Sequence, residues 1–576
     1  MLSYRKLAMR VLGRPLHTGG NDSPRPASQR AAAFILTAIM LTSLTAPAFA
    51  GTWSIENGNI TVKAGETGND VTQNNVTTKN DTNTIITNQN KDIASSNTVT
   101  IETNDKNDKV KVTLDNVNIN VGSDSGSALT SNGDVTLTLK GDNSLTGGNS
   151  GSDIGDGIHS GSLTMKGGTV NAKGGSGADG GSGIRTFSSG GVTISGGSTV
   201  KATGGDASDK DASAGGSGIL IFGSGSLTVS DSTVTATGGN GGSARGSHGG
   251  NGISGKGSLT VSGGTVTATG GDGCSGSYSD GGIGISSSSG GVTIYGGTVT
   301  ATGGKSGSGD YSNGGNGISS SGSLSISGGT VTATAGSSSG SYGRDGITTS
   351  SSLTISGGTV TANGGSGSYR GGSGISSSDI ELSGSLELTA KAGSPNGKAL
   401  SQNGSELDPN TFKEKLDPGA NIITKDADGK VIDQVSSPRP VEPEGPVIPE
   451  ESSSSSDSGS ATPSADGGSS TPSAPASPLP GLTVTDKSGQ HISYTSIRDN
   501  NVLSLRVGRF TASFRISPAT LRQLRAEGID TITFRTVLCS TTLSVDELLA
   551  MGGEDAEVVL THHIRSSTLT VGGKAV

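Results

Sequence analysis

Apolar and polar residues alternate in short runs along almost half of the chain. In the run from Thr265 to Thr269, valine and alanine share one side and the threonines share the other, which is the period-two pattern of a β-strand. A Leu-Thr-Val run (Leu259 to Val261) and the pair Gly252-Ile253 precede it, with glycine-containing corners between the three pieces. Glycine suits such corners because it accepts positive φ and close backbone approach. Each unit therefore predicts three short strands joined by tight corners.

This unit recurs every 26 to 35 residues. The copies are marked by the isoleucines of their Gly-Ile pairs, which are Ile158, Ile184, Ile219, Ile253, Ile285, Ile318, Ile347 and Ile375. No copy can bury its own apolar side chains, so the copies must stack, at roughly 4.8 Å per coil, around one shared interior. A period of this length is typical of a solenoid. We expect an all-β, right-handed parallel β-helix in which Ile253 lies over Ile285, Val261 over Ile294 and Val266 over Val299.

The ends of the chain differ from the repeats. Residues 1–50 have the features of a signal peptide, because arginines precede an apolar run from Ala31 to Met40 and Ala48-Phe49-Ala50 fits a small-residue cleavage site. We expect a mature, secreted or cell-surface chain that begins near Gly51 and has no integral membrane segment. Residues 51–150 predict an N-terminal cap with the first degenerate coils, residues 151–395 the Gly/Ser/Thr-rich repeats, and residues 396–435 a C-terminal cap.

Beyond the repeats, the composition changes twice. Residues 436–480 are rich in proline, serine and glycine and cannot bury enough apolar surface to offset their ordering entropy, so we expect a disordered, flexible linker. Residues 481–576 have fewer glycines and the first helix signals, with Ser517 and Ser544 as helix N-caps. They predict a small α+β domain, whose partner would be the cell wall or another protein.

Length variation between copies is confined to the segment between the threonine-rich strand and the next Gly-Ile pair. Insertions in a solenoid collect in loops on one face, often the binding face. In four consecutive copies this segment carries a tyrosine, at Tyr278, Tyr311, Tyr342 and Tyr369. Aromatic rings can stack on the apolar faces of successive sugars, or they can stack on one another and shield the loop backbone. The four tyrosines are our candidate polysaccharide-binding residues.

Acidic side chains in the same loops suggest a second kind of site. Calcium prefers several oxygen ligands in a flexible cage, and the candidates are Asp153, Asp156, Asp272, Asp280, Asp310 and Asp345, with Asp153 and Asp156 the metal ligands we single out. The alternative is that these residues are solvated turn acids. The copies match the calcium-binding nonapeptide only in their glycines, since its aspartate position holds Ser254. This departure argues against that class of calcium site.

Composition gives little support for other chemistry. The chain has 576 residues, 99 glycines, three per cent aromatics and a net charge of −9, so nothing suggests a nucleic-acid partner. Glycoside hydrolysis requires a pair of carboxylates at a set separation, and no such pair can be assigned. His159 lies near Asp156 in sequence, and the pair His562-His563 is a further candidate for metal binding. The two cysteines, Cys274 and Cys539, fall in different regions without an activating base. We assign no catalytic residue.

One stretch carries a family resemblance. Gly155-Asp156-Gly157-Ile158-His159 and the following run from Gly161 to Val170 resemble bacterial surface proteins labelled carbohydrate-binding domain-containing. These are similar to pectin lyases in fold but lack their catalytic apparatus. The resemblance spans roughly residues 95 to 395 and implies binding of an acidic or cell-wall polysaccharide, with calcium as a candidate cofactor. The alternatives are a structural stalk or adhesin and, third, a polysaccharide-degrading enzyme of the pectin-lyase type.

Overall fold

The computed structural model describes residues 50–104, 108–149, 155–187, 189–209, 212–437, 481–486, 492, 494–499, 501–507, 511–536, 540–553, 556–562, 567–572 and 574–575. The chain divides into two compact units, Met1–Glu442 and Pro443–Val576. The predicted signal peptide, apart from Ala50, and the predicted linker, apart from Ser436 and Ser437, lie outside the described residues. Asp153, Cys539 and His563 also lie outside them.

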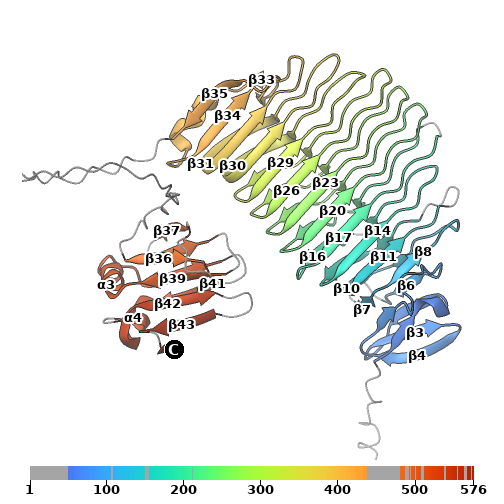
Figure 1. Cartoon of the computed structure of the whole chain (residues 1–576), viewed down its shortest axis with the longest axis horizontal. Helices are drawn as coiled ribbons and strands as arrows, with labels where there is room; N and C mark the ends of the chain where they lie inside the picture. The colour runs from blue at the N-terminus through green and yellow to red at the C-terminus, as the bar shows by residue number, and fades with distance from the viewer. Residues whose placement is uncertain are drawn as a thin grey trace, which may run out of the picture. The chain divides into compact units, whose positions relative to one another are not determined.

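The first unit is a parallel β-solenoid of about 14 turns, which confirms the predicted fold (Figure 1). Strands of successive turns pair in parallel and form three columns. The first column, which contains the Gly-Ile strands, comprises β2 (Ile60–Ala64), β6 (Val99–Glu102), β9 (Leu129–Ser131), β12 (Ile158–Ser160), β15 (Ile184–Thr186), β18 (Ile219–Ile221), β21 (Ile253–Gly255), β24 (Ile285–Ser287), β27 (Ile318–Ser320) and β32 (Leu400–Gln402).

The other two columns follow the same order along the chain. The second comprises β1 (Thr52–Ser54), β5 (Ile85–Thr87), β7 (Lys109–Asp115), β10 (Asp134–Lys140), β13 (Ser162–Lys166), β16 (Val192–Ser195), β19 (Leu227–Val229), β22 (Leu259–Val261), β25 (Val292–Ile294) and β28 (Leu324–Ile326). The third comprises β8 (Asn118–Asn120), β11 (Asp142–Thr146), β14 (Thr169–Lys173), β17 (Thr199–Thr203), β20 (Thr233–Thr237), β23 (Thr265–Thr269), β26 (Thr298–Thr302), β29 (Thr330–Thr334) and β34 (Asn421–Lys425). Two long strands, β30 (Ile347–Asn363) and β31 (Ile375–Lys391), run through all three columns.

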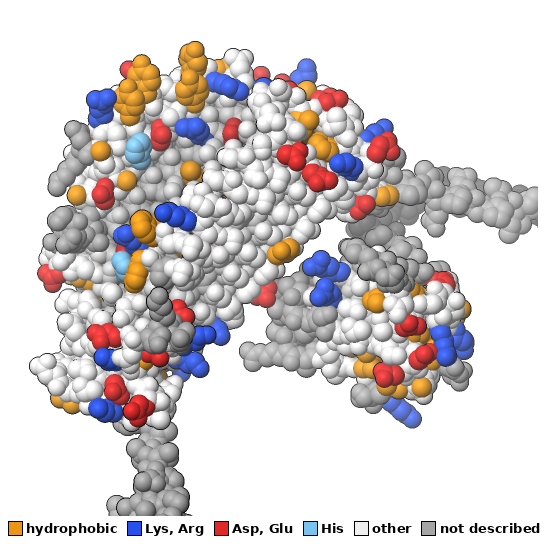
Figure 2. Space-filling model, turned by 180° about the vertical axis from the view of Figure 1, so that it is seen from behind, with side chains coloured by type: hydrophobic (Ala, Val, Ile, Leu, Met, Phe, Trp, Pro, Cys, Tyr) orange, Lys and Arg blue, Asp and Glu red, His pale blue; other side chains and the backbone are white. Residues whose placement is uncertain are grey.

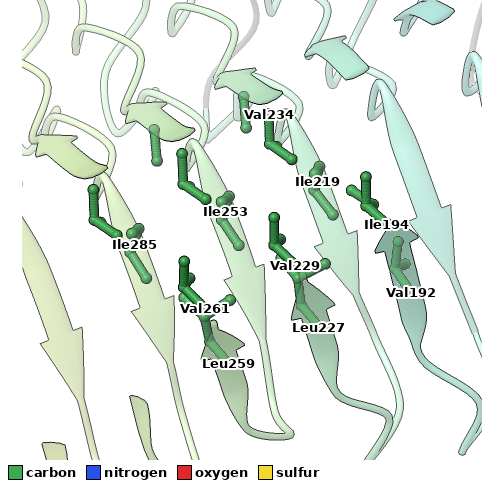
Figure 3. Packing of buried hydrophobic residues seen from close by; sticks show 14 of the residues in the cluster. Val192, Ile194, Ile219, Leu227, Val229, Val234, Ile253, Leu259, Val261 and Ile285 are labelled. Carbon is green, nitrogen blue, oxygen red and sulfur yellow. The ribbon is translucent and has the colours of Figure 1, made fainter. Parts of the chain in front are cut away.

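Identical or similar apolar side chains stack on one another inside the solenoid. Ile253 pairs with Ile285, Val261 with Ile294 and Val266 with Val299, as predicted. Figure 3 shows Ile219, Ile253 and Ile285 in one such row, and Val229 with Val261 in another. All of these side chains are buried. The register is fixed because a slip of one residue would turn every apolar side chain of a strand out to solvent.

Antiparallel strands cover both ends of the solenoid. At the N-terminal end, β3 (Asn69–Gln73) pairs with β2 and with β4 (Val76–Asp81), and the short helix η1 (Ile55–Asn57) follows β1. At the C-terminal end, β35 (Val431–Ser436) pairs with β34 and β33 (Ser405–Glu406) pairs with β32, while η2 (Pro409–Lys415) buries Phe412. An open sheet edge is a template for pairing with other chains, and these segments occupy the edges.

The second unit has its own core between two sheets and short helices. One sheet contains β36 (Leu482–Thr485), β39 (Ala512–Ile516), β42 (Val558–His562), β43 (Ser567–Val571) and β44 (Lys574–Ala575), and the other β37 (Thr495–Asp499), β38 (Val502–Arg506), β40 (Thr531–Arg535) and β41 (Ser540–Ser544). The helices are α3 (Pro518–Ala526), α4 (Val545–Leu548) and η3 (Leu549–Gly553). The Ser517 and Ser544 hydroxyls accept hydrogen bonds from the backbone of Thr520 and Glu547, which confirms both predicted N-caps.

Candidate ligand-binding face of the solenoid

The loops that follow the third column leave the stack through closely packed glycine backbones. The residues of this glycine neck donate backbone hydrogen bonds of 2.8 Å. Three bonds join the two ends of one loop, Gly250 to Gly239, Gly282 to Gly271 and Gly315 to Gly304, and two join successive turns, Gly271 to Gly250 and Gly304 to Gly282. A Cβ atom on Gly271 would lie 1.9 Å from the Gly239 carbonyl oxygen. Only glycine allows this approach, and it holds the two ends of each loop together whatever the loop's length.

Beyond the glycine neck, each loop stacks on the next. Backbone N–H groups of Gly241, Gly273 and Gly281 donate to carbonyl oxygens of Asp272, Lys305 and Asn313 at 2.8 to 2.9 Å. Figure 1 shows these loops projecting along one edge of the solenoid in a regular row. The loop side chains of successive turns are therefore held at a regular spacing.

The four predicted tyrosines lie on this face as two pairs and not as one ladder. The Tyr278 and Tyr311 rings stack with centroids 5.1 Å apart and planes 15° apart, whereas Tyr342 and Tyr369 meet edge to face at 5.6 Å and 72°. Within the described residues, no ring contact joins Tyr311 to Tyr342. The loop that carries Tyr342 is shorter than the preceding one, and the Tyr342 carbonyl pairs with Gly314, three residues past Tyr311. The Tyr342 ring is thus shifted along its loop relative to the Tyr311 ring.

All four rings remain accessible. The exposed fractions are 44% for Tyr278, 64% for Tyr311, 45% for Tyr342 and 75% for Tyr369. Figure 2 shows hydrophobic side chains projecting from the edge of a surface that is otherwise mostly white. The Arg245 guanidinium, from the preceding turn, lies 4.9 Å from the centroid of the Tyr278 ring. Tyr278 therefore has a neighbour in the turn before and in the turn after, and Tyr311 and Tyr369 offer the more open surfaces.

The backbone at the first pair has an unfavourable conformation for tyrosine. Tyr278 and Tyr311 have φ of 62° and 59°, and the equivalent residues of the two preceding loops, Ala212 and Gly246, have φ of 58° and 73°. The loop turn requires this left-handed geometry, which costs a non-glycine residue roughly 1–3 kcal/mol. Glycine would fill the position with less strain, so the bulky rings at Tyr278 and Tyr311 are not explained by the turn itself.

The loop acids bind backbone of the neighbouring turn. Oδ1 atoms of Asp272, Asp280 and Asp345 accept hydrogen bonds from the backbone N–H groups of Lys305, Asn313 and Ser373 at 2.8, 2.7 and 2.6 Å. These side chains join neighbouring turns and do not converge on a common point. Among the residues that the structure describes, no group of three or more His, Cys, Asp or Glu side chains could hold a metal ion.

The Asp156 carboxylate also binds groups within the protein. Its Oδ1 accepts from the Ser182 backbone at 2.6 Å, its Oδ2 lies 2.8 Å from His159 Nδ1, and its side chain is buried. Calcium needs several converging oxygens, and both carboxylate oxygens of Asp156 already have partners within the protein. Asp156 instead orients the His159 ring. The described loop acids therefore form no carboxylate cluster, and calcium binding at Asp153 and Asp156 stays a prediction.

The remaining candidate groups have structural partners. Cys274 is a buried free thiol whose Sγ lies 3.0 Å from the Ala244 carbonyl and 3.1 Å from Ser279 Oγ. His562 is buried in the second unit, where its ring nitrogens bond Thr536 and Thr541, and burial lowers its pKa. Within the part of the chain that the structure describes, these two residues bond a carbonyl oxygen and hydroxyl groups, which suits a structural role.

Sequence reasoning missed a second set of exposed residues, which follows the first column. Phe187 and Phe222 are 40% and 54% exposed on adjacent turns, with Arg185 and Lys256 beside the Phe222 ring. These residues are far apart in the sequence and lack a shared motif. The signal becomes visible only when the repeats are aligned, because later turns have serine at the positions of the two phenylalanines.

The chain was compared with known proteins. No protein-family model, curated protein or solved structure matches it. None of the described helices has the length and apolar character needed to span a membrane.

Proposed function

We propose that this protein is a secreted or cell-surface β-helix that binds polysaccharide through its loop face without catalysis. The observation that carries the proposal is the set of four exposed tyrosine rings on consecutive turns, two of them held in a left-handed backbone that disfavours tyrosine. Strained residues persist where surrounding structure imposes them, and they cluster at binding sites. The export-like sequence of residues 1–50 supports the location.

A repeating surface suits a repeating ligand. Within each tyrosine pair the rings lie on successive loops, with centroids 5.1 or 5.6 Å apart, and aromatic faces pack against the C–H faces of sugar rings. Tyrosine hydroxyls can also bond sugar hydroxyls. The Asp272, Asp280 and Asp345 carboxylates bind the backbone of the next turn, which favours binding over hydrolysis. A passive stalk remains the competing function, because a capped solenoid can also simply project from a surface.

The test is a glycan array probed with the mature chain, residues 51–576. The binding variant combines Tyr278→Gly, Tyr311→Gly, Tyr342→Ala and Tyr369→Ala, with glycine chosen where the backbone φ is positive. The matched control is Tyr295→Ala, because Tyr295 is 54% exposed but follows β25, away from the loops. We expect the fourfold variant to lose at least tenfold in affinity, about 1.4 kcal/mol, while the control keeps its binding.

Two results would overturn the proposal. Equal binding by the fourfold variant and the parent would remove the tyrosines from the site. No binding of the parent to any glycan would favour the stalk. Circular dichroism of each variant checks that the solenoid is intact.

A further inference from the structure

The outward face of the first column departs from its repeat over three successive turns. The outward residue at the middle of each strand is serine or threonine in most turns: Thr100, Thr130, Ser254, Ser286, Ser319, Thr348 and Ser376. Between Thr130 and Ser254 the same position holds His159, Arg185 and Leu220, paired in register. Serine and threonine satisfy the strand geometry elsewhere, so the fold does not require these three side chains.

A second departure lies beside the first. Immediately after the strands β15, β18 and β21 come Phe187, Phe222 and Lys256, whereas the next two turns have Ser288 and Ser321 there. The Phe187 ring lies 4.9 Å from the His159 ring. The Phe222 ring has Arg185 Cζ at 5.7 Å and Lys256 Nζ at 5.3 Å from its centroid. Together the six residues form one surface, the basic aromatic patch: His159, Arg185, Phe187, Leu220, Phe222 and Lys256.

Some polar groups of the basic aromatic patch have no hydrogen-bond partner within the described residues. Arg185 Nε is buried and has no hydrogen-bond partner. Within the described part of the chain, no carboxylate forms an ion pair with Arg185 or Lys256. A buried donor without a partner is unfavourable, and a ligand that supplied an acceptor would relieve this cost. His159 is held in place through Nδ1 by Asp156, with Nε2 as its second polar atom.

We propose that the basic aromatic patch is a binding site for an anionic sugar residue, such as a hexuronate within a glycan. The apolar face of the sugar packs on Phe187 and Phe222, and its carboxylate is bound by Arg185 and Lys256. A guanidinium matches a carboxylate in shape and charge, and an exposed phenyl face packs on sugar C–H groups. An isolated anion would leave both phenyl rings unused, and a neutral sugar would leave both cations unused.

This inference takes its ligand class from the proposed function, but the site shares no residue with the tyrosine loops. Its test uses the mature chain and isothermal titration with a hexuronate oligosaccharide and a neutral hexose oligosaccharide of equal length. The first variant is Arg185→Gln with Lys256→Gln, which removes two charges. The second is Phe187→Ser with Phe222→Ser, which introduces the residue found at this position in later turns. Lys201→Gln, a charge change on the third column, is the matched control.

We expect each double variant to weaken hexuronate binding at least tenfold, and the neutral oligosaccharide to bind the first variant as it binds the parent. The control should bind both like the parent, and raising the salt concentration should weaken hexuronate binding further in the parent than in the first variant. Unchanged hexuronate affinity in both double variants would overturn the proposal, even if the tyrosine variant lost all glycan binding. So would binding of an acidic peptide, but no hexuronate, by the parent. Loss of hexuronate binding only in the patch variants would support this site independently of the tyrosines.

Discussion

Asp345 links one turn of the solenoid to the next. It immediately precedes a Gly-Ile pair, where Asn251 and Asn316 stand in earlier turns, and all three side chains accept a hydrogen bond from the backbone of the following turn. Burial raises the pKa of Asp345, against smaller opposing effects of the Ser373 N–H and nearby arginines. The site therefore needs the acceptor oxygen and disfavours the charge.

Replacing Asp345 by asparagine should therefore stabilise the solenoid at neutral pH. A carboxyl whose pKa is raised by folding contributes stability while it is protonated, and this contribution is lost as the pH rises through the folded-state pKa. The asparagine side chain would keep the acceptor without the charge, so we expect Asp345→Asn to melt at a higher temperature than the parent at pH 7. The difference should shrink at pH 3. Asp272→Asn, at an exposed position, is the control, and an equal rise there would contradict this account.

At the scale of elements, the strands and their register follow from the local pattern, since Val266 and Ala268 alternate with threonine and can face only one interior. The arrangement of the loops does not follow from it. Four tyrosines in similar sequence contexts form two pairs because loop length shifts Tyr342 relative to Tyr311. Likewise, Arg185 and Phe222 come together through the pairing of adjacent turns, which no single repeat reveals. Sequence alone thus predicted the scaffold and the candidate face, but not the contacts on it.

A side chain in the glycine neck should destabilise the solenoid. Gly271→Ala would place a methyl group 1.9 Å from the Gly239 carbonyl oxygen, so the backbones must separate. We expect a loss of roughly 1–3 kcal/mol in the free energy of unfolding, the usual cost of overpacking. Gly296→Ala is the control, because its Cβ would meet only the Ser262 carbonyl, at 3.6 Å. Urea titration of both variants measures the difference, and equal stabilities would show that the neck tolerates side chains.

At the scale of the whole molecule, each unit has a separate hydrophobic core. One runs the length of the solenoid, and the other is built around Phe514 and Phe534, whose ring centroids lie 5.3 Å apart. A unit with its own core can fold without the rest of the chain.

We expect residues 481–576, expressed alone, to unfold in one cooperative transition. Among the described residues of this segment, nineteen buried side chains form the core, which is compatible with a small independent domain. Thermal denaturation followed by circular dichroism tests this. A fragment without a cooperative transition would show that the domain depends on residues before 481.

Deleting residues 396–437 while keeping the C-terminal domain should promote association. The deletion would uncover β31, whose pairing with β32 and β34 occupies its edge, and exposed edges pair with other chains. Light scattering coupled to size exclusion should report larger assemblies than for the full chain. Removing residues 481–576 instead is the control, since β31 stays covered. An unchanged mass after the first deletion would contradict the prediction.

The glycine neck also allows the sequence of a loop to be replaced by another. Because main-chain atoms alone clamp the two ends of each loop, its intervening sequence can be exchanged without disturbing the interior rows of isoleucine and valine. A foreign peptide inserted between Gly271 and Gly282 would be displayed with both ends anchored, next to identical anchor points in the adjoining turns. The solenoid is in this respect a ready scaffold for presenting ordered arrays of chosen peptides.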